Sequence, residues 1–388
     1  MVKFAHMSDI HLGGWRYPEL QRLNFESFQK TIEICIEERV DFILIAGDLF
    51  DTAFPPIEIL KETFAEFRKL HDSKIPCFLI SGSHDYSVSG KTFLDVLEKA
   101  GFCKNVYDFE DKDEKIILNP TIYNNVAIYG YPGKKTGLDV QDLRRIELKE
   151  SSLFKILMLH TTIDKAKGDL PIESIETDSL PYADYYALGH LHISFSYRNF
   201  VYPGPLFPNN FVELEILKHG TFNIVNIDTV NSNFSLKKIE LKIKEVELVT
   251  CEITDAVTAT EKIISELDKR HLNDKIVLLR LKGNLENSKN SDINFKQISE
   301  FTRRNGVYFM LKNVHELKTK EYVLEFEIEN PENIEEEIVK SHVEKNPSEF
   351  NSLIFQLINS LAIEKQEGET SEGFSKRILD DSKKILRF

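Results

Sequence analysis

The stretch that decides the predicted fold is Phe42-Ile43-Leu44-Ile45-Ala46-Gly47-Asp48, an apolar run that ends in a glycine and an aspartate. Short continuous apolar runs are typical of strands that are buried on both faces of a sheet. Three more such runs follow at residues 77–80, 156–159 and 185–188, and segments with a helical spacing of apolar residues lie between them. This alternation predicts an α/β domain that is built in layers.

Histidines and carboxylates follow the predicted strands at the point where each strand ends. The residues concerned are Asp9, His11, Asp48, His84, Asp85, His160, His190 and His192, with Ser83 among them. The carboxyl ends of strands in an open α/β sheet form the ligand crevice, so we expect these side chains to converge although they are scattered in the sequence. Burying several such groups together is costly unless cations compensate them. The cluster therefore predicts a metal site.

The ligand types narrow the choice of metal and of reaction. Carboxylates and imidazoles without a thiolate favour Mn²⁺, Fe²⁺, Zn²⁺ or Co²⁺, and the number of ligands is too large for one ion. Two metal ions that share a carboxylate form the usual clamp for in-line displacement at phosphorus, and Asp48 is the natural bridge.

The composition is that of a globular protein and excludes several classes. The 388 residues are 41% hydrophobic, and no apolar run reaches the roughly 18 to 20 residues that span a bilayer. No signal peptide is recognisable at the start, so we expect a soluble, intracellular protein. The four cysteines lie far apart, which argues against a zinc ribbon or a disulfide framework. The formal charge of -14 argues against a protein that holds nucleic acid by an overall positive field.

Changes in sequence pattern predict three domains. Residues 1–235 form the layered domain, residues 236–328 a small α/β domain, and residues 329–388 a helical segment. The helical segment carries an apolar stripe that consists of Phe350, Leu353, Ile354, Leu357, Leu361, Phe374 and Ile378. Two or three helices bury such a stripe poorly alone, so it either packs back on the main body or docks onto a partner helix or coiled coil.

The series of motifs resembles that of the calcineurin-like metallophosphoesterases, over roughly residues 4–205. The series consists of Asp-x-His at 9–11, Gly-Asp at 47–48, Gly-x-His at 82–84, His160, and Gly-His-x-His at 189–192. Within that family, residues 4–13, residues 41–50 and Tyr202-Pro203-Gly204 resemble the DNA double-strand-break repair nucleases of the bacterial SbcD and the archaeal and eukaryal meiotic recombination type. The resemblance implies a layered β-sandwich flanked by helices, a small α/β capping domain and C-terminal helices.

The resemblance also implies a role for each matching residue. One metal ion would be held by Asp9, His11, Asp48 and His192, and the other by Asp48, Ser83, His160 and His190. His84 would orient the phosphate and protonate the leaving oxygen. The implied cofactors are two Mn²⁺ per chain, with Mg²⁺ or other divalent ions as alternatives, and the implied activity is that of an exonuclease and single-strand endonuclease.

Partners and location follow from the same resemblance. The implied partners are DNA ends, an SMC-like coiled-coil ATPase that the C-terminal helices bind, and a second copy of the chain. The implied location is the cytoplasm, in association with the nucleoid and not with a membrane.

Two residues depart from the family pattern. Ser83 stands where the family has an asparagine whose carboxamide oxygen is a ligand of the second metal, so we expect weaker binding of that metal. Asp51 stands where some relatives carry histidine, and it is either a further carboxylate beside the metal site or the N-cap of a helix that begins near Pro55. Like Asp51, Asp85 is a candidate for a residue that contacts the metal ligands without binding the metal itself.

Two other functions stay open on the sequence alone. A phosphatase or small-molecule phosphodiesterase is the alternative within the same class, because the metal site does not itself choose the substrate. A non-catalytic scaffold on a decayed phosphoesterase fold is the alternative from another class, and the nearly complete ligand set argues against it. The acidic charge is compatible with DNA, because nine of the glutamates lie in residues 331–370, away from the predicted metal site.

Overall fold

Two six-stranded sheets pack face to face in the first of the two units into which the chain divides. The computed structural model describes residues 1–85, 87, 91–134, 139–169, 171–285, 289–319, 339, 343, 349–363 and 371–386. The two units are Met1–Lys320 and Glu321–Phe388.

The strands of each sheet come from distant parts of the sequence. In spatial order the first sheet contains β15 (Asn233–Leu241), β14 (Gly220–Asp228), β1 (Val2–Met7), β2 (Phe42–Ala46), β3 (Cys77–Ile80) and β4 (Lys104–Asn105). The second sheet contains β12 (Ser194–Tyr197), β13 (Phe200–Pro203), β11 (Tyr185–Gly189), β10 (Phe154–His160), β8 (Val126–Tyr131) and β7 (Thr121–Tyr123). Strands β1, β2 and β3 are parallel, and so are β8, β10 and β11, so their carboxyl ends share one edge in each sheet.

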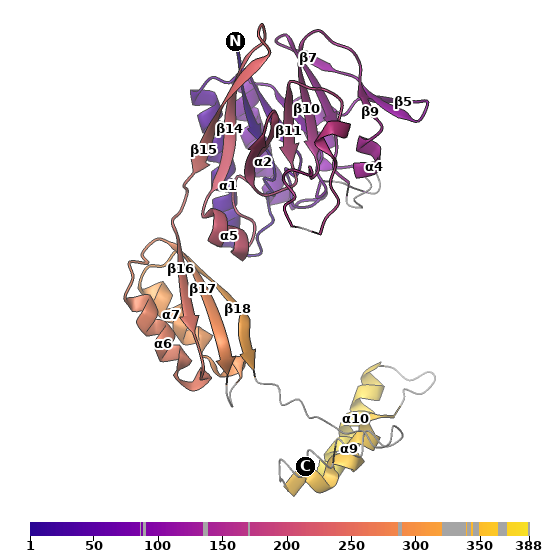
Figure 1. Ribbon diagram of the computed structural model, residues 1–388. Coiled ribbons are helices and arrows are strands. Elements are labelled where there is room, and N and C mark those ends of the chain that lie inside the picture. The colour runs from indigo at the N-terminus through magenta and orange to yellow at the C-terminus, as the bar shows by residue number, and fades with distance from the viewer. Residues whose placement is uncertain are drawn as a thin grey trace. The chain divides into compact units, whose positions relative to one another are not determined.

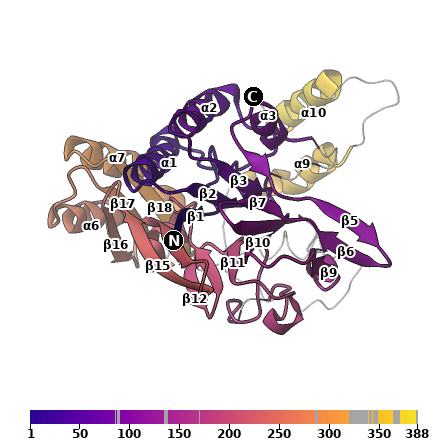
Figure 2. The same ribbon diagram turned by 90° about the horizontal axis from the view of Figure 1, so that it is seen from above.

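Apolar layers lie between the sheets and outside them. The space between the sheets is filled from both sides, for example by Phe4 and Leu44 of the first sheet and Met158 and Ala187 of the second. Helices α1 (Pro18–Glu37), α2 (Ile57–Asp72) and α3 (Phe93–Lys99) cover the outer face of the first sheet (Figure 2). The outer face of the second sheet is covered by α4 (Asp139–Leu143) and by a small sheet of β5 (Phe109–Lys112), β6 (Lys115–Leu118) and β9 (Ile146–Leu148). The predicted α/β sandwich flanked by helices is therefore confirmed.

Local sequence signals set the ends of several helices. Helix α1 begins at Pro18, whose fixed φ suits a first turn, and it is followed by Arg39 at φ +53°. Helix α3 begins with a capping box in which Thr92 and Asp95 each accept from the other's backbone. Because these signals are local, the sequence pattern predicts helices in these places.

A fourth sheet, of three strands, completes the first unit. It consists of three parallel strands, β16 (Val246–Glu252), β17 (Ile276–Leu285) and β18 (Phe309–Thr319), with helices α6 (Ala256–Asp268) and α7 (Phe295–Arg304) on one face (Figure 1). Strand β18 begins in a short apolar segment and continues through mostly polar residues, because it pairs with β17 as far as Thr319. The remaining short elements of this unit are α5 (Phe211–Leu217), η1 (Thr177–Ser179) and η2 (Asn290–Asp292).

The second unit is helical where the structure describes it. It contains η4 (Glu349–Leu353), α9 (Ile354–Leu361) and α10 (Ser371–Leu386). Of the predicted apolar stripe, Leu361 is exposed, whereas five residues are half-buried, namely Leu353, Ile354, Leu357, Phe374 and Ile378. The side chain of Phe350 lies outside the described part of the structure. Among the described helices of the whole chain, none is long and apolar enough to cross a membrane.

A histidine inside the sandwich makes the stability of the fold sensitive to acid. His6 on β1 is fully buried, and its Nδ1 lies 2.9 Å from the Tyr185 hydroxyl. Burial lowers the pKa of His6 from 6.5 to about 3. The unfolded chain therefore binds a proton below pH 6.5 that the folded chain does not, so stability is lost as the pH falls from 6.5 toward 3 and is unaffected by this group above 6.5.

We expect the His6→Gln variant to remove this dependence on pH. The free energy of unfolding of the wild type should fall, through this group, by up to about 1.4 kcal/mol per pH unit below 6.5. The difference in stability between wild type and variant should therefore shrink between pH 6.5 and pH 4.5, as measured by urea unfolding with His71→Gln, an exposed histidine of α2, as the control. A difference that stays constant over this range would show that His6 takes up no proton on unfolding.

Candidate metal centre

The carboxyl ends of five strands bring the predicted site residues together. Asp9 and His11 follow β1, Asp48 follows β2, His84 follows β3, His160 ends β10, and His192 follows β11. Three groups of these side chains each place their possible ligand atoms within 4.8 Å of one another. The first group is Asp9, His11 and His192; the second is His11, Asp48 and His84; the third is Asp9, Asp48 and His160. Convergence of the strand ends is the arrangement that the sequence predicted.

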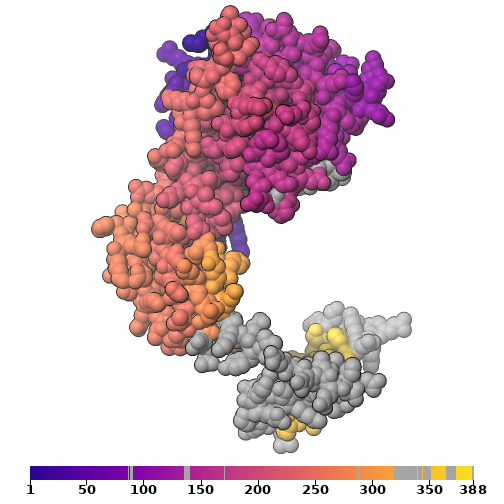
Figure 3. Space-filling model, in the orientation of Figure 1, coloured from indigo at the N-terminus to yellow at the C-terminus, as the bar shows by residue number. Residues whose placement is uncertain are grey.

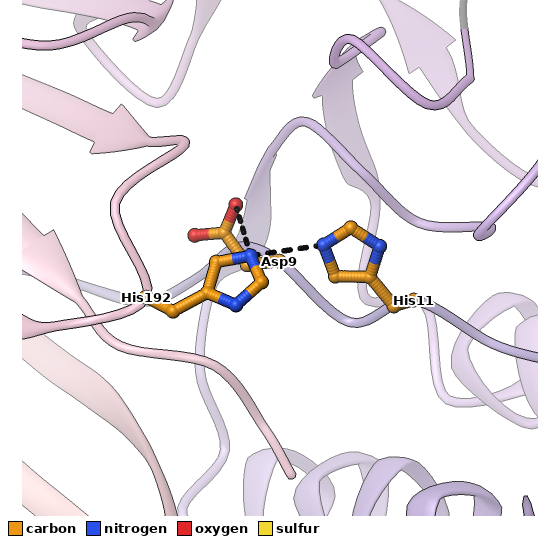
Figure 4. Close-up of side chains that lie close together, drawn as sticks. All are labelled: Asp9, His11 and His192. Atoms are coloured by element: carbon orange, nitrogen blue, oxygen red, sulfur yellow. Dashed lines mark hydrogen bonds and ion pairs between the residues drawn. The ribbon is translucent and has the colours of Figure 1, made fainter. Parts of the chain in front are cut away.

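In the first group, two imidazole nitrogens face each other. His11 Nε2 lies 3.1 Å from His192 Nε2, and His192 Nε2 lies 4.0 Å from Asp9 Oδ1 (Figure 4). Asp9 is fully buried, and its oxygens accept hydrogen bonds from Ser8 Oγ at 2.6 Å and from the His190 backbone N–H at 2.9 Å. Two ring nitrogens and a carboxylate that point at one place match the nitrogen and oxygen ligands that a divalent cation prefers.

The Asp48 carboxylate lies among the members of the other two groups. Its Oδ1 accepts a 2.7 Å hydrogen bond from the His84 backbone N–H, and its Oδ2 lies 3.1 Å from His160 Nε2 and 3.7 Å from His11 Nε2. Burial opposes ionisation of Asp48, but His160 and His11 hold its pKa well below the usual range. The carboxylate thus stays charged although it is buried.

His160 provides a test of whether these residues fit a metal. Its Nδ1 lies 2.9 Å from the Ala46 carbonyl oxygen, which can only accept, so Nδ1 carries a hydrogen. The other ring nitrogen, Nε2, is buried and lies 3.1 Å from Asp48 Oδ2, and it has no well-aligned hydrogen-bond partner among the described residues. The Asp48 charge raises the pKa of His160 against the effect of burial. The Asp48 carboxylate thus stabilises positive charge at His160 Nε2, and a divalent cation held by these two side chains would supply that charge in place of the proton, so the residues fit a divalent metal.

The backbone is strained at these positions. Four non-glycine site residues adopt a positive φ, namely Asp9 (52°), His11 (47°), Asp48 (53°) and His190 (95°). Such conformations cost on the order of 1 to 3 kcal/mol each and are concentrated at functional sites. Gly82 is required beside them, because a Cβ at this position would collide with the Asp48 carboxylate and backbone nitrogen. The fold therefore maintains an unfavourable backbone to hold these side chains in place.

Asp51 links two histidines of the site. Its Oδ1 accepts from His11 Nδ1 at 3.2 Å, and its backbone oxygen accepts from His84 Nδ1 at 2.9 Å. The Asp51 carboxylate, whose Oδ1 lies 3.5 Å from His84 Nδ1, raises the pKa of His84 to about 9 against the effect of desolvation, and the charge of Asp48 adds a smaller contribution. The alternative in which Asp51 caps a helix is wrong, because α2 begins at Ile57 with Pro56 at its N-cap.

Asp85 lies behind the ligands. Its buried carboxylate accepts hydrogen bonds from the backbone N–H groups of Leu49 at 3.1 Å, Phe50 at 3.0 Å and Gly82 at 3.1 Å. Burial, and then the charge of Asp48, raises the pKa of Asp85 to about 6. These bonds tie the loop after β2 to the loop after β3 and so fix the backbone that carries Asp48.

Two predicted ligands and one unpredicted residue complete the description of the site. Ser83 lies in the loop after β3, next to His84. Among the described residues, His190 belongs to none of the three groups of histidines and carboxylates, although its ring packs edge-on against His160 with a centroid distance of 5.1 Å. Glu213 on α5, which the sequence did not single out, lies with Oε1 2.9 Å from His192 Nδ1. In the sequence, Glu213 is recognisable only as the glutamate three residues after Asn210, and this pattern indicates the start of a helix and not a metal site.

Comparisons with known proteins identify a family and several relatives to which this chain is similar. Residues 2–194 match the model of the calcineurin-like phosphoesterases. The DNA double-strand break repair protein Mre11 of Archaeoglobus fulgidus is 24% identical over 95% of this chain and 87% of its own length. The protein of the same name from Saccharolobus solfataricus is 32% identical over 50% of each chain, and an uncharacterized metallophosphoesterase of Bacillus subtilis is 28% identical over 52% of each. The matched region thus spans about half the length of the latter two relatives.

Proposed function

Because residues 2–194 belong to the calcineurin-like phosphoesterase family, whose members use a divalent metal, we propose that this chain is a Mn²⁺-dependent DNA nuclease that acts in the repair of double-strand breaks. The observation that carries the choice of DNA is the extent of the likeness to the Archaeoglobus protein. That likeness covers 95% of this chain and so reaches well beyond residues 2–194.

Seven residues would hold the two metal ions. In this proposal, Asp9, His11, Asp48 and His192 hold one Mn²⁺, and Asp48, Ser83, His160 and His190 hold the other. The close approach of His160 Nε2 to Asp48 Oδ2 supports the assignment, as does the strained backbone at Asp9, His11 and Asp48. When bound, two divalent ions make the attacking water more acidic and neutralise the charge that develops at phosphorus.

His84 would act on the leaving group. Its side chain is 46% exposed, whereas the side chains of His11 and Asp48 are each 2% exposed, so it can reach a phosphodiester bound over the buried ligands. Asp51 holds Nδ1 through its backbone oxygen, which leaves Nε2 as the ring atom that can serve the substrate. We propose that His84 donates a proton to the leaving oxygen while Asp85 keeps the Asp48 loop in place.

The rest of the chain would bind partners. We propose that residues 236–328 cap the nuclease domain of residues 1–235, and that residues 329–388 dock onto an SMC-like coiled-coil ATPase at the nucleoid. The half-buried apolar residues of α9 and α10 support docking, because a pair of short helices leaves part of its apolar face to water. We further propose that two copies of the chain associate.

The substitution Ser83→Asn should strengthen binding of the second metal. A carboxamide oxygen reaches further than a serine hydroxyl and is a better neutral donor, so we expect second-site Mn²⁺ affinity to rise by about 10-fold, the lower end of the effect of a single residue that supports a metal. Calorimetric titration of the full chain measures this, with Ser291→Asn, an exposed serine, as the control. Equal second-site affinities in wild type and Ser83→Asn would contradict a ligand role for this position.

A paired assay tests the proposed function against its alternatives. We expect the full chain with Mn²⁺ to degrade linear duplex DNA and to cut circular single-stranded DNA, and to lose both activities with excess chelator. A simple aryl phosphate monoester is the second substrate. Robust turnover of the monoester without DNA cleavage would establish the phosphatase alternative, and no turnover of either substrate would establish the scaffold.

A further inference from the structure

Helix α5 lies between the metal centre and the small sheet of β16, β17 and β18. Glu213 and Glu215 are two positions apart on this helix, so their side chains leave it in nearly opposite directions. Glu213 contacts His192 of the metal centre, and Glu215 forms an ion pair with Arg280 of β17. One short helix thus connects a metal ligand to a residue 65 positions beyond Glu215 in the sequence.

On the metal side, Glu213 is held by several donors. Its Oε2 accepts from the Asn209 backbone N–H at 2.7 Å, and its Oε1 accepts from Asn210 Nδ2 at 2.6 Å and from His192 Nδ1 at 2.9 Å. Because a carboxylate only accepts, the hydrogen of the neutral His192 ring sits on Nδ1, and Nε2 is left as the ligand atom that faces Asp9 and His11. Carboxylates in this position behind a metal-binding histidine fix its tautomer and orientation.

On the other side, Arg280 holds the helix against the small sheet. Its side chain is 18% exposed and forms a fork with both Glu215 oxygens, together with a further pair to Glu316 of β18. The guanidinium also lies over the Phe211 ring, 5.4 Å from the centroid. Leu214 packs in the same apolar cluster as Ile276 and Leu278 of β17, and the two parts of the unit are in contact in the space-filling view (Figure 3).

We propose that α5 is a positioning element, in which Glu213 aligns His192 for metal binding while Arg280 keeps the helix in the place where Glu213 can do so. This inference rests on the proposed function, because it assumes that His192 is a metal ligand. Beyond the proposed function, we infer that the sheet of β16, β17 and β18 contributes to metal affinity, although none of its described residues contacts the metal centre.

The test compares metal binding by four full-length proteins. We expect Glu213→Gln to weaken first-site Mn²⁺ binding by about 10- to 100-fold, the usual effect of removing an outer partner of a ligand histidine. Arg280→Gln, outside the metal centre, should weaken it by about 2- to 30-fold, which is the range for mutations along a coupled network. The matched control is Arg270→Gln, which breaks the exposed pair with Glu247 on the small sheet and should leave the affinity unchanged.

Two readouts separate positioning from general damage. Calorimetry gives the Mn²⁺ affinity, and the visible absorption of bound Co²⁺ reports the ligand geometry, which we expect to change in Glu213→Gln and not in Arg270→Gln. Thermal melting of the metal-free proteins shows whether each variant folds. If Glu213→Gln does not fold, the Mn²⁺ affinity of Arg280→Gln alone tests the inference. Wild-type affinity in Glu213→Gln, or in a folded Arg280→Gln, would overturn the inference. A wild type that binds no Mn²⁺ would instead overturn the proposed function and the inference with it.

Discussion

The Asp48→Asn variant should lose metal binding and all cleavage activity that depends on it. Asp48 is 2% exposed, and its carboxylate lies within 4 Å of both His160 Nε2 and His11 Nε2, so a single change affects both groups of ligands. An asparagine has one acceptor oxygen in place of two and no charge to balance a divalent ion. We expect Mn²⁺ affinity to fall by more than about 100-fold, the upper end of the effect of losing only an outer partner.

A melting experiment measures this loss without an activity assay. Mn²⁺ at 100 times its dissociation constant should stabilise the wild type by about 2.7 kcal/mol per site, because it binds the folded state alone. The shift in melting temperature should vanish in Asp48→Asn and persist in Asp268→Asn, which changes an exposed aspartate of α6. An unchanged Mn²⁺ shift in Asp48→Asn would mean that Asp48 does not bridge the ions.

The residues that could be predicted from the sequence are those that follow directly after buried strands. The run Phe42–Ala46 coincides with β2, so Asp48 lies at a strand end whose position the apolar pattern already indicates. His160 is predictable for the same reason, since it is the last residue of β10. Within each sheet, parallel strands bring their carboxyl ends to one edge. Asp48 and His160 belong to different sheets, so their convergence also depends on the face-to-face packing of the two sheets, which the apolar runs alone do not indicate.

Contacts between distant segments could not be predicted in this way. Glu213 reads locally as part of a helix cap, and only the folded chain shows that the same carboxylate reaches His192. The pairing of Arg280 with Glu215 joins two exposed-looking charged residues that lie 65 positions apart. Two interpretations of Asp51 stayed open because the sequence does not locate the start of α2 to within a turn, and α2 begins six positions after Asp51, at Ile57.

The His84→Gln variant should cleave DNA about 10²- to 10⁴-fold more slowly, which is the usual contribution of a general acid. Its Mn²⁺ affinity should change little if the residue acts on the leaving group. This comparison is informative because His84 also lies within reach of His11 and Asp48, in a group that could itself hold a metal. A loss of affinity as large as that of Asp48→Asn would assign His84 to the ligands. His71→Gln on α2 is the control for removal of an exposed imidazole.

The choice of leaving group separates the two roles of His84 further. A nucleoside alkoxide needs a proton as it departs, whereas a nitrophenolate is weakly basic and departs without one, so a general acid matters much less for the second. We therefore expect the defect of His84→Gln to be large on DNA and at least about 10-fold smaller on a bis(nitrophenyl) phosphodiester under the same metal concentration. If His84 instead orients the phosphate or holds the metal, both substrates lose its contribution and the two defects are equal. The Asp51→Asn variant keeps the hydrogen bond from His84 Nδ1 to the backbone oxygen but loses the carboxylate that raises the pKa of His84, so we expect it to cleave DNA more slowly than the wild type and faster than His84→Gln.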